Sequence, residues 1–176
     1  MNKARLGLWL SIGFFLLGGA LFYGAVQIAL SAAVPAKGLS MLQKAVHSAD
    51  EVEISFLSSG QLPPTGGRYR TKKFPQDYNI VSTRRLTSQQ TKELLALFQQ
   101  HEFSAASGAM CHDPGFVLRF NQGGRTILTC SLCLHCVNIE VEPFPWCPLW
   151  ISIFDMNARN HQLPKLEDFF AKLNKS

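Results

Sequence analysis

The chain has 176 residues, of which 47% are hydrophobic and 16% charged, so it is neither disordered nor collagen-like. Three of the 17 basic residues precede Leu39, whereas all 12 acidic residues follow it, so the net charge from Leu39 onward is only +2. Because nucleic-acid binding needs a dense cationic surface, this near balance argues against a nucleic-acid partner. The five cysteines are too few for a disulfide-dense miniprotein.

An apolar segment without charged side chains runs from Leu6 to Ala36. Its part from Leu6 to about Leu30 is long enough to cross the roughly 30 Å hydrocarbon core of a bilayer as a helix. Lys3 and Arg5 precede it, and the positive-inside rule then places the N-terminus in the cytoplasm. We expect a single-pass protein of the cell inner membrane, with an anchor in residues 1–36, lipid contact through residues 6–30 and an extracytoplasmic domain in residues 37–176.

A cleaved signal peptide is the alternative interpretation of this segment. Ser31-Ala32-Ala33 and Val34-Pro35-Ala36 both offer small residues to a signal peptidase. The apolar stretch is about 25 residues long, however, whereas the apolar region of a signal peptide typically has about 7–15. This length favours an uncleaved anchor.

The first predicted elements of the exported part are a helix and two strands. The spacing of Leu39, Leu42, Ala45 and Val46 predicts a short amphipathic helix that ends near Ala49-Asp50. Alternating apolar residues then predict strands around Val52–Phe56 and Tyr78–Leu86. We expect a long exposed loop from Ser58 to Asp77, because this stretch is rich in proline and glycine.

The clearest helix signal follows. Thr87 and Gln90 form a capping-box pattern, and the helix is expected to stop near Gln100. Leu94, Leu95, Leu97 and Phe98 supply its apolar face, of which Leu94, Leu95 and Phe98 should be buried against the hairpin strands.

A β-hairpin is predicted next, with Phe116–Asn121 and Arg125–Cys136 on either side of a turn at Gln122–Gly124. Further along, Val137–Val141 alternates like a strand and Trp150–Phe154 is another strand candidate. A closing helix is expected to bury Leu166, Phe169, Phe170 and Leu173. This order of elements indicates an α+β fold: an N-terminal transmembrane helix followed by a small antiparallel-sheet domain with two or three helices.

The register of the predicted hairpin determines which residues lie opposite Cys111. A two-residue turn at Gly123-Gly124 places Cys111 opposite Cys136 and His112 opposite His135, whereas a four-residue loop places Cys111 opposite Leu134. Either register brings Cys111 beside Cys133 or Cys136. Three thiolates could meet one ion only if the strand ends or bulges near Cys133, because alternate residues of a regular strand point to opposite faces.

The pattern from Cys111-His-Asp-Pro114 through the hairpin to Leu132-Cys133-Leu-His-Cys136 resembles one found in small uncharacterised bacterial exported or membrane-anchored proteins. The resemblance covers only this segment, and Cys130 and Cys147 have no counterpart in it. It implies a shared site and no particular activity.

Three interpretations of the cysteine cluster stay open. In an oxidising compartment, a disulfide among Cys111, Cys133 and Cys136 is the first. A structural metal site, with zinc as the ion, is the second; its candidate ligands are Cys111, His112, Cys133, His135 and Cys136. The third is a redox-active thiol.

We therefore expect a binding or structural role in the cell envelope, with a protein partner there, and a thiol–disulfide oxidoreductase using Cys133 and Cys136 as the alternative. Trp146 and Trp150 lie in a proline-rich aromatic stretch that could dock such a partner or fill the core. Cys130 is expected to be a buried free thiol, too far along the strand to share the site.

Overall fold

The structure is a computed structural model, and it describes residues 17–23, 25, 36–59, 66–71, 75–105, 111–142, 152–156 and 163–175. The chain divides into two compact units, Met1–Val34 and Pro35–Ser176. Residues 17–23 and 25 of the first unit are helical. Among the described residues, none of the helices has the length and apolar character needed to cross a membrane. The rest of the predicted span Leu6–Leu30 lies outside the described residues.

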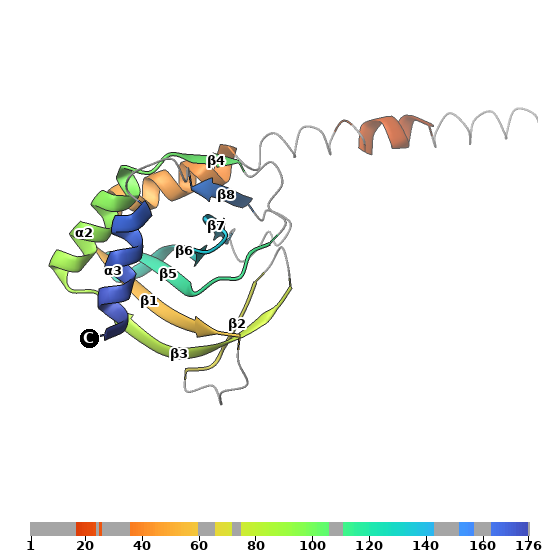
Figure 1. Cartoon of the computed structure of the whole chain (residues 1–176). Coiled ribbons are helices and arrows are strands. Elements are labelled where there is room, and N and C mark those ends of the chain that lie inside the picture. The colour runs from red at the N-terminus through yellow and green to blue at the C-terminus, as the bar shows by residue number, and fades with distance from the viewer. Residues whose placement is uncertain are drawn as a thin grey trace, which may run out of the picture. The chain divides into compact units, whose positions relative to one another are not determined.

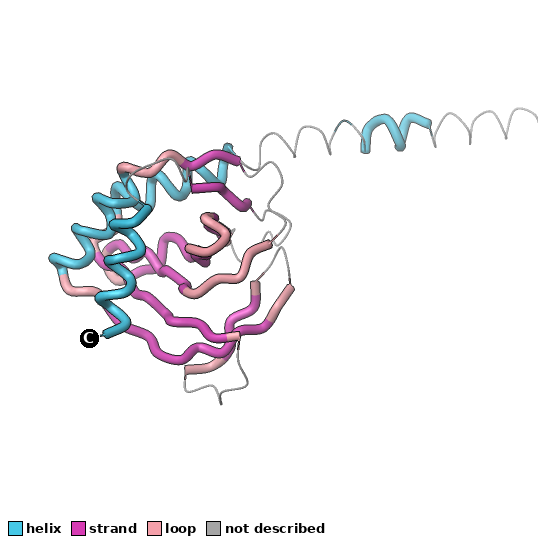
Figure 2. The backbone as a smooth tube through the Cα atoms, in the orientation of Figure 1, coloured by secondary structure: helices cyan, strands magenta, loops and turns pink. Residues whose placement is uncertain are grey.

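The second unit confirms the α+β expectation, because helices pack on an antiparallel sheet (Figure 1). The strands neighbour one another in the order β2-β3-β1-β5-β6-β7-β8-β4, and every pairing is antiparallel. Figure 2 shows the strands of this unit following an arc, with the helices of the same unit gathered on one side of it. The strands are β1 (Glu51–Ser58), β2 (Arg68–Arg70), β3 (Asp77–Arg85), β4 (Phe103–Ala105), β5 (Phe116–Gln122), β6 (Arg125–Cys133), β7 (Asn138–Val141) and β8 (Ser152–Met156).

The helices among the described residues of this unit are residues 36–48, α2 (Ser88–Gln99) and α3 (Leu163–Lys175). The first confirms the predicted amphipathic helix, with Leu42, Ala45 and Val46 buried. α3 confirms the predicted closing helix, and all four of the apolar residues expected in its buried face are buried.

The capping box of α2 forms as predicted. The side chain of Thr87 accepts a hydrogen bond from the backbone N–H of Gln90, and Gln90 Oε1 accepts one from the backbone N–H of Thr87. The helix buries Thr91, Leu94, Leu97 and Phe98. Leu94 and Phe98 are thus buried as predicted, whereas Leu95 is only half-buried against the core and Leu97 of the same apolar face is buried in its place.

Loss of the cap should be measurable. Thr87→Ala removes the acceptor for the Gln90 N–H, and we expect it to lower the free energy of unfolding by about 1 kcal/mol. Urea denaturation of a fragment covering Pro35–Ser176 measures this, with Ser88→Ala at the exposed first residue of α2 as the control. Equal stabilities of the two variants would contradict the capping role.

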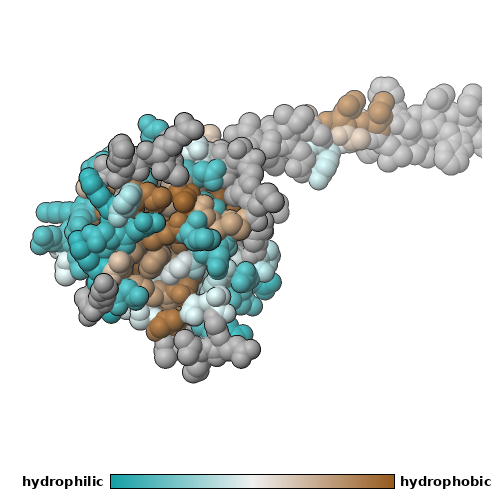
Figure 3. Space-filling view, in the orientation of Figure 1, coloured by the Kyte–Doolittle hydropathy of each residue, from teal (hydrophilic) through white to brown (hydrophobic). Residues whose placement is uncertain are grey.

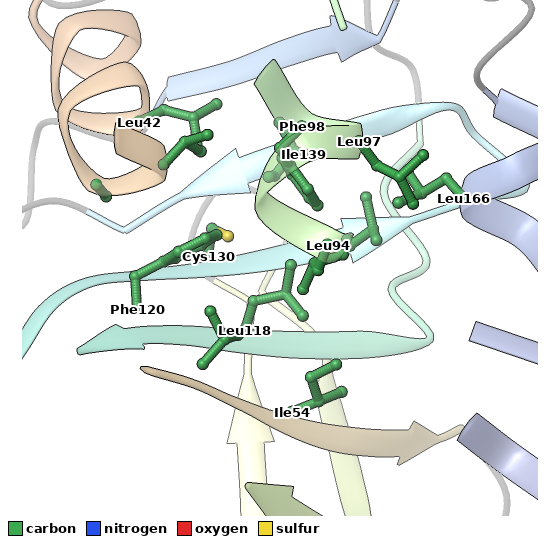
Figure 4. Packing of buried hydrophobic residues seen from close by; sticks show 14 of the residues in the cluster. Leu42, Ile54, Leu94, Leu97, Phe98, Leu118, Phe120, Cys130, Ile139 and Leu166 are labelled. Carbon is green, nitrogen blue, oxygen red and sulfur yellow. The ribbon is translucent and has the colours of Figure 1, made fainter. Parts of the chain in front are cut away.

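One main core lies between the helices and the sheet. Figure 4 shows Leu42, Leu94, Phe98 and Leu166 of the helices facing strand residues, among them Ile54, Leu118, Phe120, Cys130 and Ile139. In Figure 3 hydrophobic side chains gather in the middle of the visible face and hydrophilic ones surround them. A second, smaller cluster joins Tyr69, Tyr78, Ile80 and Val117.

Some strands differ from the prediction. β2 lies inside the stretch expected to be a loop, and β4 follows α2 where no strand was expected. At three residues each, these strands are too short to give a periodic signal. β8 reaches Met156, beyond the expected end at Phe154.

The β5–β6 hairpin has the predicted two-residue turn. Gly123 and Gly124 have φ values of 56° and 75°, as a type I′ turn requires, and Gln122 pairs with Arg125. The four-residue loop considered as an alternative is therefore wrong. A bulge between Phe120 and Asn121 then shifts the register by one residue, so that Phe116 pairs with Leu132.

Candidate functional site: a cluster of three cysteines

The sulfur atoms of Cys111 and Cys136 lie 2.8 Å apart. Cys111 precedes β5, and Cys136 lies in the turn after β6. The predicted proximity of Cys111 to Cys133 or Cys136 is confirmed.

The route to this proximity differs from the prediction. β6 ends at Cys133, so the expectation of one strand through Cys136 is wrong, and His112 does not pair with His135. Residues 134–137 form a turn closed by a hydrogen bond from the Val137 N–H to the Leu134 carbonyl. Val137 has φ of 52°, a left-handed conformation that a β-branched residue rarely adopts. This turn brings Cys136 back toward Cys111.

Cys133 is the third member of the cluster. Its side chain is fully buried, and its Sγ accepts a hydrogen bond of 3.0 Å from the backbone N–H of Cys136. Strand alternation turns Ser131 and Cys133 away from the main core, into which Cys130 and Leu132 point. The cysteine cluster, defined as Cys111, Cys133 and Cys136, therefore lies on the sheet face opposite the helices.

The three thiols differ in acidity. Burial opposes ionisation of Cys136, but hydrogen bonds from the Cys111 and Cys133 thiols and from the backbone of Asp113 lower its pKa below the ordinary value. Burial, and then the hydrogen bond to Cys136, raise the pKa of Cys133 to about 12. Donation to Cys136 also raises the pKa of the exposed Cys111 thiol. Cys136 is thus the sulfur of the cluster that ionises most readily.

His112 lies beneath the cluster in a buried hydrogen-bond network. Its Nδ1 is 2.6 Å from Asn138 Oδ1, and its Nε2 is 2.7 Å from Ser131 Oγ. Asn138 Nδ2 donates to the Cys111 carbonyl at 2.9 Å, which turns Oδ1 toward the imidazole. Nδ1 must then carry the proton, and Nε2 accepts from the Ser131 hydroxyl. This network ties the segment around Cys111 to β6 and β7.

The predicted metal ligands are only partly brought together. Cys111, Cys133 and Cys136 meet, but both ring nitrogens of His112 are engaged by other side chains. His135 is exposed in the turn. Within the described ranges, no group of three or more His, Cys, Asp or Glu side chains is arranged to hold a metal ion.

The burial of His112 predicts a pH dependence of stability. Burial lowers the pKa of His112 below the ordinary 6.5, more than its hydrogen bond to Asn138 raises it. As the pH falls below about 6.5, the unfolded chain binds a proton that the folded domain does not, so the free energy of unfolding decreases. The slope contributed by this residue should approach about 1.4 kcal/mol per pH unit.

Urea denaturation of the Pro35–Ser176 fragment between pH 7 and pH 5 measures that slope. His112→Gln should be less stable at pH 7 but show a flatter decline. A decline as steep in the variant as in the wild type would assign the acid sensitivity to other groups.

The remaining cysteines are separate from the cluster. Cys130 is fully buried in the main core with a free thiol, as predicted. Burial raises its pKa well above the ordinary value. Cys147, Trp146 and Trp150 lie outside the described residues.

Sequence reasoning missed Ser131, Asn138 and Tyr78. Tyr78 of β3 is buried close to the cluster, and burial, followed by the neighbouring Asp113 carboxylate, raises the pKa of its hydroxyl. The available signal was strand alternation, which places Ser131 on the same face of β6 as Cys133.

A groove of about 550 Å³ lies apart from the cluster, along the helix of residues 36–48 and the end of α2. The side chain of His101 lines it, and its Nδ1 donates to the Leu97 carbonyl at 2.9 Å. The other ring nitrogen is buried and has no hydrogen-bond partner among the described residues. The apolar side chains of the groove are Leu42, Val46, Phe98 and Phe103.

Comparison of the chain with known protein families, with curated proteins and with solved structures finds no match.

Proposed function

We propose that the protein is a membrane-anchored protein of a bacterial cell envelope, with a binding or structural role, whose exported domain is cross-linked by a Cys111–Cys136 disulfide. The observation that carries the proposed cross-link is the 2.8 Å distance between the two sulfur atoms. This distance is shorter than two non-bonded sulfur atoms normally approach. A disulfide requires only a further closure to about 2.05 Å.

The same distance favours the disulfide over zinc. Two thiolates on one tetrahedral zinc ion lie roughly 3.8 Å apart, because each Zn–S bond is about 2.3 Å long. Cys111 and Cys136 are already closer than that. With His112 engaged on both nitrogens, a fourth protein ligand from that residue would also require the buried network to break.

The structural part of the role is supported by the network under the cluster. His112, Ser131 and Asn138 are buried and hydrogen-bonded, and they hold the Cys111 segment on the sheet. The binding part is supported by the groove beside α2. A concave, partly apolar surface with one buried acceptor nitrogen is typical of a small-ligand site.

The membrane anchor is supported by the charge-free segment from Leu6 to Ala36 and by the basic residues before it. A reporter enzyme fused after Ser176 should be active only outside the cytoplasm. The full-length protein should stay in the membrane after high-salt and alkaline washes. Recovery of a soluble form starting at Val34 or Lys37 would instead identify a cleaved signal peptide.

The second candidate is a thiol–disulfide oxidoreductase using Cys133 and Cys136. The observation in its favour is the lowered pKa of Cys136, which lies in contact with two further thiols. In such enzymes, however, the first cysteine of C-x-x-C usually opens a helix and has the lowered pKa. Here the first cysteine, Cys133, ends a strand and has a pKa raised to about 12. Redox chemistry at this site would therefore run through Cys136 and Cys111.

A further inference from the structure

We propose that the Cys111–Cys136 disulfide exchanges with a pair of exposed thiols on another exported protein, with Cys111 as the sulfur attacked and Cys136 as the leaving group. This inference rests on the proposed Cys111–Cys136 disulfide. It adds an activity to what was so far a structural cross-link, and it assigns the redox pair to Cys111 and Cys136 rather than to the C-x-x-C motif.

The exposure of each cysteine side chain indicates which sulfur another protein's thiolate can attack. Of the four cysteines that the structure describes, Cys111 is the exposed one, Cys136 is half-buried, and Cys130 and Cys133 are buried. Another protein's thiolate must approach along the S–S axis with its own backbone outside the domain. Cys111 is the sulfur that permits this approach.

The surroundings of Cys136 suit a leaving group. When the disulfide opens, the Cys136 thiolate lies within hydrogen-bond reach of the Cys111 and Cys133 thiols and of the Asp113 backbone. These interactions lower the pKa of Cys136, and a thiol of lower pKa leaves faster. The Cys111 thiol exists only after reduction, and all three donors bind a thiolate more strongly than a disulfide sulfur, so they stabilise the reduced form and make the disulfide a stronger oxidant.

The exchange transfers two electrons from the partner's thiols to the Cys111–Cys136 disulfide. A thiolate of the partner attacks Cys111 Sγ, the Cys111–Cys136 bond breaks, and the electron pair of that bond leaves on Cys136. A second thiolate of the partner then attacks the partner's own first sulfur, which forms the partner's disulfide and releases Cys111. Of the two protons lost by the partner's thiols, Cys111 takes one and solvent takes the other. The partner is oxidised by two electrons, and the Cys111–Cys136 pair is reduced by two.

Cys133 acts here as a positioning residue. Its thiol donates to Cys136 once Cys136 is a thiolate, and its Sγ accepts the Cys136 N–H. It is fully buried and does not meet the partner.

The experiment is a redox equilibrium of the full-length protein, in detergent micelles, with reduced and oxidised glutathione as the probe. The oxidised fraction is read by alkylation and peptide mass at each glutathione ratio. Cys133→Ala removes a hydrogen bond to the thiolate, so the equilibrium should shift toward the disulfide by about 10- to 100-fold. Cys133→Ser keeps a donor and should shift it less. Cys130→Ala, a buried thiol on the other face of the same strand, is the matched control and should not shift it.

Acid quenching of the oxidised protein shortly after mixing with reduced glutathione identifies the attacked sulfur. Glutathione should be found on Cys111, and finding it mainly on Cys136 or Cys133 would overturn the assignment. If the Cys111–Cys136 disulfide is present but stays oxidised at every glutathione ratio, it is purely structural: the exchange is overturned and the proposed cross-link stands. If no Cys111–Cys136 disulfide forms in oxidised glutathione, the exchange and the proposed cross-link are both overturned.

Discussion

Cys111→Ser should lower the free energy of unfolding of the oxidised domain by about 3.5 kcal/mol. The two cysteines are 25 positions apart in the chain, and a cross-link over a loop of that size removes a corresponding amount of entropy from the unfolded state. Urea denaturation of the Pro35–Ser176 fragment, oxidised and with reductant, measures the effect. The reductant should destabilise the wild type by a similar amount and leave Cys111→Ser unchanged.

Further variants make this prediction specific. Cys136→Ser should match Cys111→Ser, and the double variant should add little, because both changes remove the same bond. Cys130→Ser should keep the response to reductant, since Cys130 is a free thiol in the main core. A wild-type stability that does not respond to reductant would count against the cross-link.

Leu94→Ala should lower the free energy of unfolding by about 2–5 kcal/mol. Leu94 is fully buried where α2 packs on the sheet, and truncating it leaves a cavity in the main core (Figure 4). Leu95→Ala should cost less, because Leu95 is only half-buried. Chemical denaturation of the three proteins under one set of conditions gives the comparison.

Gln99→Ala is the control on the same helix, at an exposed position, and should change stability by less than about 0.5 kcal/mol. An equal loss for Leu94→Ala and Leu95→Ala would mean that α2 is rotated relative to the packing described above.

Elements with a strong local signal were predictable from the sequence. The capping box at Thr87 and Gln90 fixed the start of α2, and the apolar spacing of Leu166, Phe169 and Phe170 fixed α3. β2 and β4 were not predictable, because each is only three residues long; β2 is held by pairing with the next strand, β3, and β4 by pairing with the distant β8.

The sequence predicted that the members of the cysteine cluster lie close together, but not which of their atoms are in contact. A tight turn at Gly123-Gly124 forces the chain on either side together, which was enough to bring Cys111 near Cys136. The bulge near Phe120 and the turn after Cys133 decide which atoms meet, and neither has a clear sequence signal.

No sequence motif indicates the hydrogen-bond network around His112. Ser131 and Asn138 come from two strands that pair with each other, and their meeting with His112 depends on register and on the path of the segment before β5. His112, considered as a metal ligand on composition, instead donates to Asn138 and accepts from Ser131.

The most direct test of the proposed cross-link is disulfide mapping of the full-length protein purified from the envelope without reductant. Free thiols are alkylated in denaturant before proteolysis, and the peptides are weighed. We predict a peptide pair joined through Cys111 and Cys136, with Cys130 and Cys133 alkylated. Alkylation of both Cys111 and Cys136, or a disulfide that joins either of them to any other cysteine, would contradict the proposed cross-link.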